Sequence, residues 1–68
     1  MSPWAKAALI GLAGDPLYPV IVRATALELL RRYPGEDVDA AYEKALVNEE
    51  ALIRRTAANG YGRVAPDL

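Results

Sequence analysis

The chain has neither cysteine nor histidine among its 68 residues, and this absence limits the possible folds more than any other feature. A globular chain of this length buries only about 60% of the surface that it exposes when unfolded. Small domains commonly compensate with disulfides or a structural metal ion, and the missing residue types almost exclude both. We therefore expect stability to come from close packing or from self-association.

The same absence excludes several classes of function. Thiol chemistry, Cys/His zinc sites, haem attachment through a Cys-x-x-Cys-His motif and histidine acid–base catalysis all need the missing side chains. The paired carboxylates Asp37 and Asp39, like Glu49 and Glu50, suit a helix N-terminus better than acid–base catalysis. We expect no enzyme activity, no cofactor and no metal site.

The charge balance gives no overall attraction to nucleic acid or to an anionic membrane, because eight basic residues face nine acidic ones. No apolar run approaches the roughly 18 to 20 residues of a membrane span, and the first residues do not resemble a signal peptide. We expect a soluble, cytoplasmic protein without membrane contact.

Proline and glycine divide the chain into four helical segments. Hydrophobic residues make up 53% of the chain, with five aromatic side chains and no phenylalanine, which favours closely packed helices and predicts an all-α fold. The first helix begins at Pro3 after Ser2 as N-cap and ends at the "GDP" of residues 14–16. The second starts near Pro19 and runs to Tyr33, before a proline and a glycine.

The third and fourth segments differ in amphipathic character. Residues 36–48 have the cleanest helical stripe, with Tyr42 in the core, and the fourth helix ends near Gly60 as a C-terminal glycine. We expect an irregular tail after it. The second helix is apolar over more than half its circumference, which predicts a central position.

The two halves of the chain have similar sequences. "VRATA" at residues 22–26 corresponds to "IRRTA" at residues 53–57, an offset of 31, and the preceding helices match at about 34. Such offsets are typical of helical solenoids. The sequence therefore predicts two helical hairpins, residues 3–34 and 36–60, in a module over residues 1–62 with a tail at 63–68.

These residues resemble HEAT repeats, the PBS-lyase/HEAT-like helical repeats. "LAGDP" followed by "VIVRATALELL" is similar to the turn and second helix of the family, and "ALVNEEALIRRTAANG" is a looser match. The second hairpin departs from the pattern through Asn48 in place of aspartate, Arg55 in place of a small residue, and Gly60. The resemblance covers residues 5–60 and implies an α-solenoid fragment: a non-catalytic scaffold for protein–protein interaction, cut from a larger protein.

The resemblance also implies a ladder of hydrogen bonds between turn and second helix, joining Asp15 to Arg23 and Asn48 to Arg54. A guanidinium in an apolar helix is tolerated when its donors reach turn carbonyls and a carboxylate. This role accounts for Arg23 at the start of the most hydrophobic helix.

Two other resemblances are weaker. "AAYEKALVNEE" is similar to the second helix of a tetratricopeptide repeat, although the following turn lacks proline. "YPVIVRATALELLRRYPG" is similar to segments of bacterial multihaem c-type cytochrome proteins that carry helical repeats. That resemblance implies a periplasmic protein whose haem lies outside this chain.

Candidate contact residues are arginines, aromatic residues and leucines. An arginine patch of Arg31, Arg32, Arg55 and Arg63 is the basis of the alternative function, a nucleic-acid accessory module. As an isolated fragment, the chain is expected to form a two-fold homodimer that buries Trp4, Leu27 or Leu30 with Ile53. The candidate interaction surface as a whole comprises Trp4, Tyr18, Leu27, Leu30, Arg31, Arg32, Arg55 and Tyr61.

Overall fold

The computed structural model describes residues 3–64, and the side chains of residues 4–60. This part of the chain forms four helices and no strand: α1 (Pro3–Gly14), α2 (Val20–Leu30), α3 (Glu36–Leu46) and α4 (Ala51–Val64). The predicted all-α fold of helical hairpins is confirmed.

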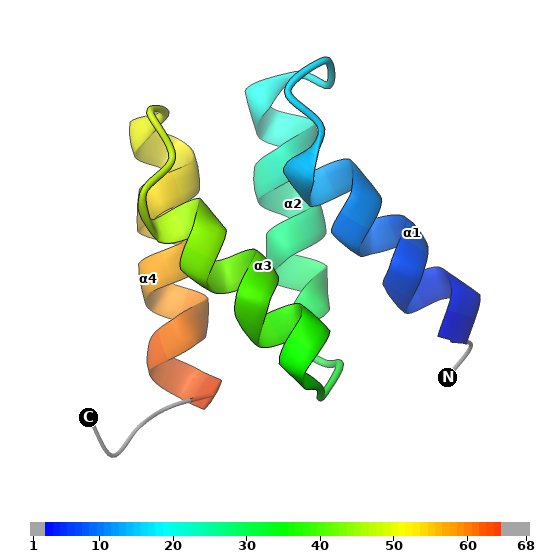
Figure 1. Ribbon diagram of the computed structural model, residues 1–68. Helices are drawn as coiled ribbons and strands as arrows, with labels where there is room; N and C mark the ends of the chain where they lie inside the picture. The colour runs from blue at the N-terminus through cyan, green and yellow to red at the C-terminus, as the bar shows by residue number, and fades with distance from the viewer. Residues whose placement is uncertain (1–2, 65–68) are drawn as a thin grey trace.

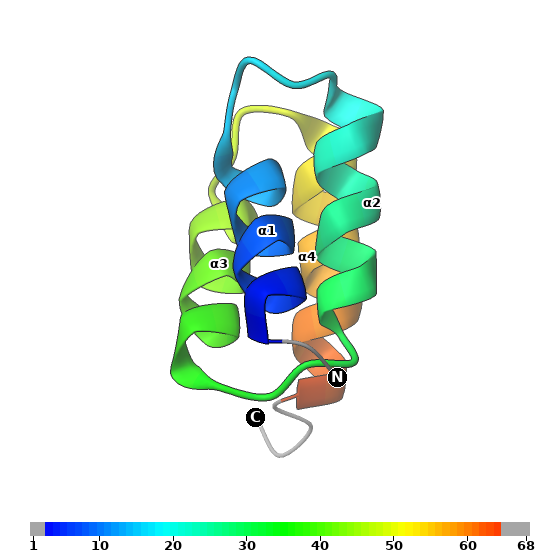
Figure 2. The ribbon, with the colours of Figure 1, turned by 90° about the vertical axis from the view of Figure 1, so that its right-hand side faces the viewer.

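The helices form two hairpins that pack side by side (Figure 1). The first helices, α1 and α3, lie in one layer, and the second helices, α2 and α4, lie in the other (Figure 2). The turn of each hairpin lies at the same end of the molecule, so the hairpins have the same orientation. The Cα atoms fill a flat volume of 30 × 28 × 14 Å.

Prolines and glycines set the helix boundaries. As predicted, α1 begins at Pro3 and ends at Gly14, whereas α2 begins just after Pro19, whose carbonyl accepts the first helical hydrogen bonds. The backbone continues past Leu30 as a tightened turn, in which the amides of residues 31–33 donate to carbonyls three residues back. Helix α2 therefore ends at Leu30 rather than at Tyr33, whose helical conformation the following proline disfavours.

The prediction that the fourth helix ends near Gly60 is wrong, because α4 continues to Val64. A Cβ atom on Gly60 would lie 2.6 Å from Cε1 of Tyr42, closer than real atoms approach. Glycine is needed here for the close approach of an aromatic ring, not for a helix end. The side chains of Tyr61 and Arg63, named above as contact residues, lie outside the described residues, as does Ser2.

The core joins the two hairpins. Its largest fully buried side chains are Leu27, Leu30, Val38, Tyr42 and Ile53. The predicted buried face of α3 is confirmed, and α2 is central as expected because it contacts the other three helices. Leu27, Leu30 and Ile53 were expected in an exposed dimer interface; that prediction is wrong, since packing between the hairpins covers all three.

Tyr42 links three helices. Its ring packs on Gly60 of α4, and its hydroxyl donates a hydrogen bond to the carbonyl of Leu27 in α2. In a regular α-helix that carbonyl would accept the amide of Arg31, but this amide donates to Glu28 instead, at 3.3 Å. The tightened end of α2 thus leaves a buried acceptor for the tyrosine.

Alkaline pH is expected to destabilise the fold through Tyr42. Burial raises the pKa of its phenol above the ordinary value of 10.0, with a contribution from Glu28 that Arg31 opposes. Because the folded-state pKa is the higher one, this stabilisation is complete below pH 10 and is lost as pH rises through the folded-state pKa. Urea midpoints from pH 7 upward should fall less in Tyr42→Phe than in the native chain. Identical falls would contradict this role for the phenol.

The connection between the hairpins is fixed by a glycine and an ion pair. Gly35 has a φ of +132°, and a Cβ atom there would lie 2.6 Å from Oδ1 of Asp37. Lys6 of α1 donates to Asp37 Oδ1 at 3.3 Å and to the Pro34 carbonyl at 3.2 Å. Partial desolvation raises the pKa of Asp37, but hydrogen bonds from Lys6 and the Val38 amide outweigh it and lower the pKa overall.

Candidate docking groove and hairpin turns

The turns of the two hairpins share the same local geometry. Oδ1 of Asp15 accepts the Leu17 amide at 2.9 Å, and Oδ1 of Asn48 accepts the Glu50 amide at 2.8 Å. Each is an Asx turn, in which the side chain bonds to the backbone two residues on. The sequence match between the hairpins therefore corresponds to a match in hydrogen bonding.

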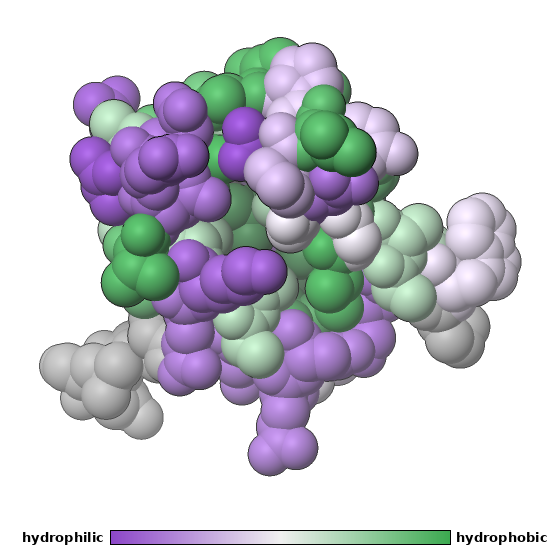
Figure 3. Space-filling view, turned by 45° about the horizontal axis from the view of Figure 1, so that its top comes forward, coloured by the Kyte–Doolittle hydropathy of each residue, from purple (hydrophilic) through white to green (hydrophobic). Residues whose placement is uncertain are grey.

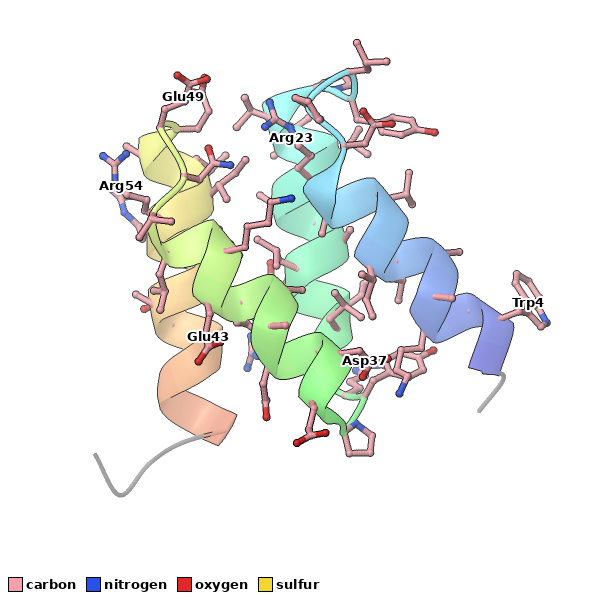
Figure 4. All side chains as sticks on the ribbon, viewed as in Figure 1. Trp4, Arg23, Asp37, Glu43, Glu49 and Arg54 are labelled. Carbon is pink, nitrogen blue, oxygen red and sulfur yellow. The ribbon has the colours of Figure 1, made fainter. Side chains whose placement is uncertain are left out.

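An arginine holds each turn from the second helix (Figure 4). Arg23 Nε donates to the Tyr18 carbonyl at 3.0 Å, and Arg54 Nη1 donates to the Asn48 carbonyl at 2.7 Å. The expected partnership of Asn48 with Arg54 therefore occurs through the main chain.

The expected bond between Asp15 and Arg23 is not among the hydrogen bonds or ion pairs of the described residues. Oδ1 of Asp15 is instead bonded to its own turn, at the Leu17 amide. Both arginines bond to carbonyls of their own hairpin, so they stabilise turns rather than forming a ladder between neighbours.

Replacement of Arg23 separates its polar and apolar contributions. Arg23→Ala is expected to lower the free energy of unfolding by about 1 kcal/mol, because it removes a hydrogen bond and the packing of the aliphatic stem. Arg23→Met keeps most of the stem and should be milder. Thermal melts followed by circular dichroism measure both, and equal melting temperatures would contradict this interpretation.

Two of the candidate arginines lie at one hollow. Arg31 and Arg32 line an open hollow of about 420 Å³ on α2, shared with Glu28, whose lining does not include Arg55 of α4. Glu28 also pairs with Arg31 at 3.7 Å. The guanidinium Nε of Arg31 is buried without a hydrogen-bond partner. The mixed charge of this hollow makes it a poor phosphate site.

The most apolar surface feature is a groove between α1 and α2, which we call the α1–α2 groove. It is open, has a volume of about 240 Å³, and is lined by both helices of the first hairpin, which lie toward the viewer in Figure 2. Ile21 and Leu29 in it are 64% and 43% exposed. Its lining residues are Leu9, Leu12, Ile21, Val22, Thr25, Ala26 and Leu29.

None of the groove residues was among the contact residues predicted from the sequence. They belong to the apolar stripes of two helices, and such stripes normally indicate core. Four predicted contact residues are exposed: Trp4, Tyr18, Arg32 and Arg55. Trp4, at 75%, points away from the helices, and Tyr18 lies at the first turn.

The two hairpins differ in polarity at the end of the molecule where both turns lie. Strongly hydrophilic residues gather over the turn between α3 and α4, whereas paler and hydrophobic residues lie over the turn between α1 and α2 (Figure 3). Glu43, Arg55 and Ala58 are exposed on the second hairpin, as are the large apolar residues Val47, at 82%, and Leu52, at 40%. The two hairpins therefore present chemically different surfaces at their turns.

Within residues 3–64, no group of three or more acidic side chains is placed to hold a metal ion. None of the helices in this range combines the length and apolar character needed to cross a membrane. No protein-family model, curated protein or solved structure gives a match to this chain.

Proposed function

We propose that this chain is a non-catalytic helical-repeat scaffold that mediates protein–protein interaction as part of a larger α-solenoid. The observation that carries the proposal is the α1–α2 groove. A monomeric protein rarely leaves aliphatic side chains exposed along a continuous groove, and such surfaces are typical of interaction sites. The matched turns support a repeat architecture, since each hairpin is built by the same hydrogen bonds.

Outside the groove, the exposed surface of the second helices is more polar and includes Glu28, Arg32, Arg55 and Asn59. The groove lies between a first and a second helix at one side of the molecule. Binding there buries apolar area without the desolvation of charged groups.

Photo-crosslinking tests this function. A benzophenone amino acid is placed at Leu29 in the groove or, as a control, at Val47, which is more exposed but lies outside the groove. In the cells that produce the protein, we expect a discrete protein adduct from position 29 and none from position 47. Equal adducts from both positions, or none from position 29, would contradict the proposal.

The nucleic-acid alternative is tested separately. A titration with a short DNA duplex at two salt concentrations should show no binding, because Glu28 shares the hollow of Arg31 and Arg32 and pairs with Arg31. Binding that weakens steeply with salt would instead support a phosphate-contact surface.

A further inference from the structure

The second hairpin carries a surface that is equivalent to the α1–α2 groove of the first hairpin. Asp15 and Asn48, which form the same turn, lie 33 residues apart, and Arg23 and Arg54 lie 31 apart. We call residues related by these offsets equivalent, with 33 for the first helices and 31 for the second. The groove residues Leu9, Leu12, Val22, Ala26 and Leu29 then correspond to Tyr42, Ala45, Ile53, Ala57 and Gly60.

The other two lining residues, Ile21 and Thr25, correspond to Leu52, which is exposed, and Thr56, which is half-buried. The five counterparts named above are all buried, whereas the groove is open. They are covered by the first hairpin: the Tyr42 hydroxyl bonds to the Leu27 carbonyl, and Ile10 and Ala13 of α1 lie beside Ala45. The first hairpin thus packs onto the second through one defined surface, which we call the covering face. It consists of Ile10, Ala13, Leu27 and Leu30.

We propose that the α1–α2 groove is the docking site of a further helical hairpin, which packs on it as the first hairpin packs on the second. This rests on the proposed function and specifies its partner. The occupant presents small and branched apolar side chains from two antiparallel helices, in the manner of the covering face. The interface between the two hairpins of this chain would then be repeated once more, between the added hairpin and the first hairpin.

A second copy of this chain does not offer such a face. Its covering face is occupied by its own second hairpin. On the outer side of that second hairpin, as far as its side chains are described, the covering-face positions of Ile10, Ala13 and Leu27 are taken by Glu43, Leu46 and Ala58. Glu43 is an exposed carboxylate, and burying it without a partner is unfavourable. The apolar surface that a further hairpin can cover therefore lies on the α1–α2 side.

An extended chain tests the proposal. Residues 1–35 are added directly before Pro3 of the full chain, so that the added α2 leads into α1 through the native connection at Gly35. The chain has no cysteine, so a Leu29→Cys substitution in the original first hairpin gives a single reactive thiol in the groove, at a position whose equivalent, Gly60, is buried. Val47→Cys is the matched control on the second hairpin.

Docking is expected to slow thiol labelling of the Leu29→Cys chain by at least about tenfold on extension, since the thiol then reacts only through local opening. Labelling of Val47→Cys should not change. Replacing Leu27 and Leu30 by Glu in the added hairpin alone should restore the fast rate. Unchanged labelling of Leu29→Cys in the extended chain would overturn the proposal.

A second copy in the groove would appear differently. The molar mass of the unextended chain would double with concentration, and labelling of Leu29→Cys would slow at the same concentrations; this result also overturns the proposal. A protein adduct at position 29 without protection in the extended chain would leave the scaffold function standing and refute only the hairpin as occupant.

Discussion

Tyr42→Ala is expected to lower the free energy of unfolding by about 3–5 kcal/mol, as for other buried aromatic side chains. The tyrosine is the largest fully buried side chain, and it touches both α2 and α4 from its place on α3. Neighbouring side chains can often move to fill the cavity left by a truncated residue, but this relaxation is restricted here because three helices meet at the ring. For a chain of this size, the loss is a large part of the total stability.

Urea unfolding followed by circular dichroism measures this loss, and Tyr42→Phe is the control. The phenylalanine keeps the ring and removes only the hydroxyl, leaving the Leu27 carbonyl without its partner, so a loss of about 1–3 kcal/mol is expected. If Tyr42→Ala were no more destabilising than Tyr42→Phe, the ring would not be the junction of the two hairpins.

Gly60→Ala is expected to destabilise the protein by about 1–3 kcal/mol, as overpacking of a core does. Alanine in place of a helical glycine normally stabilises by up to about 1 kcal/mol. Here the new methyl group would lie 2.6 Å from Cε1 and 2.8 Å from the hydroxyl oxygen of Tyr42. Because the ring of Tyr42 is fully buried, it cannot move away from the new methyl group. The free-energy cost of the clash therefore exceeds the gain from the higher helix propensity of alanine.

Gly11 provides the matched control. It lies within α1, and a Cβ atom there would have no neighbour within 4 Å. Gly11→Ala should therefore stabilise the protein, so the two substitutions should shift the urea midpoint in opposite directions. In a Tyr42→Leu background, the penalty of Gly60→Ala should shrink, because the clashing atoms are gone. The same sign at both glycines would contradict the packing of Tyr42 on α4.

The helices and their starts follow from local chemistry, which explains why the sequence predicted them. Pro3 and Pro19 mark helix starts through their own backbone restrictions, and the stripe containing Val38 and Tyr42 needs no knowledge of its partner. The internal match was also visible, because two similar turns require similar residues at similar spacing.

Other features depend on contacts that sequence position does not reveal. Gly60 looks like a helix end until the ring of Tyr42, from another helix, is placed against it. The sequence shows that Leu27 and Leu29 are both apolar residues of one helix. It does not show that Leu27 is covered by the second hairpin whereas Leu29 is exposed in the groove. Arg23 can reach several acceptors, and the course of the turn selects the Tyr18 carbonyl.

Two equivalent hairpins are stacked in this molecule. The first hairpin covers one surface of the second hairpin, and the equivalent surface of the first hairpin is the open α1–α2 groove. Val22 and Ile53 are equivalent positions, half-buried in the groove and fully buried in the core respectively. The most direct measurement is the thiol-labelling rate of Val22→Cys and Ile53→Cys in the native-length chain. We expect Ile53→Cys to react at least about a hundredfold more slowly, because only opening of the hairpin interface exposes it. Comparable rates at the two positions would contradict the stacking of the hairpins.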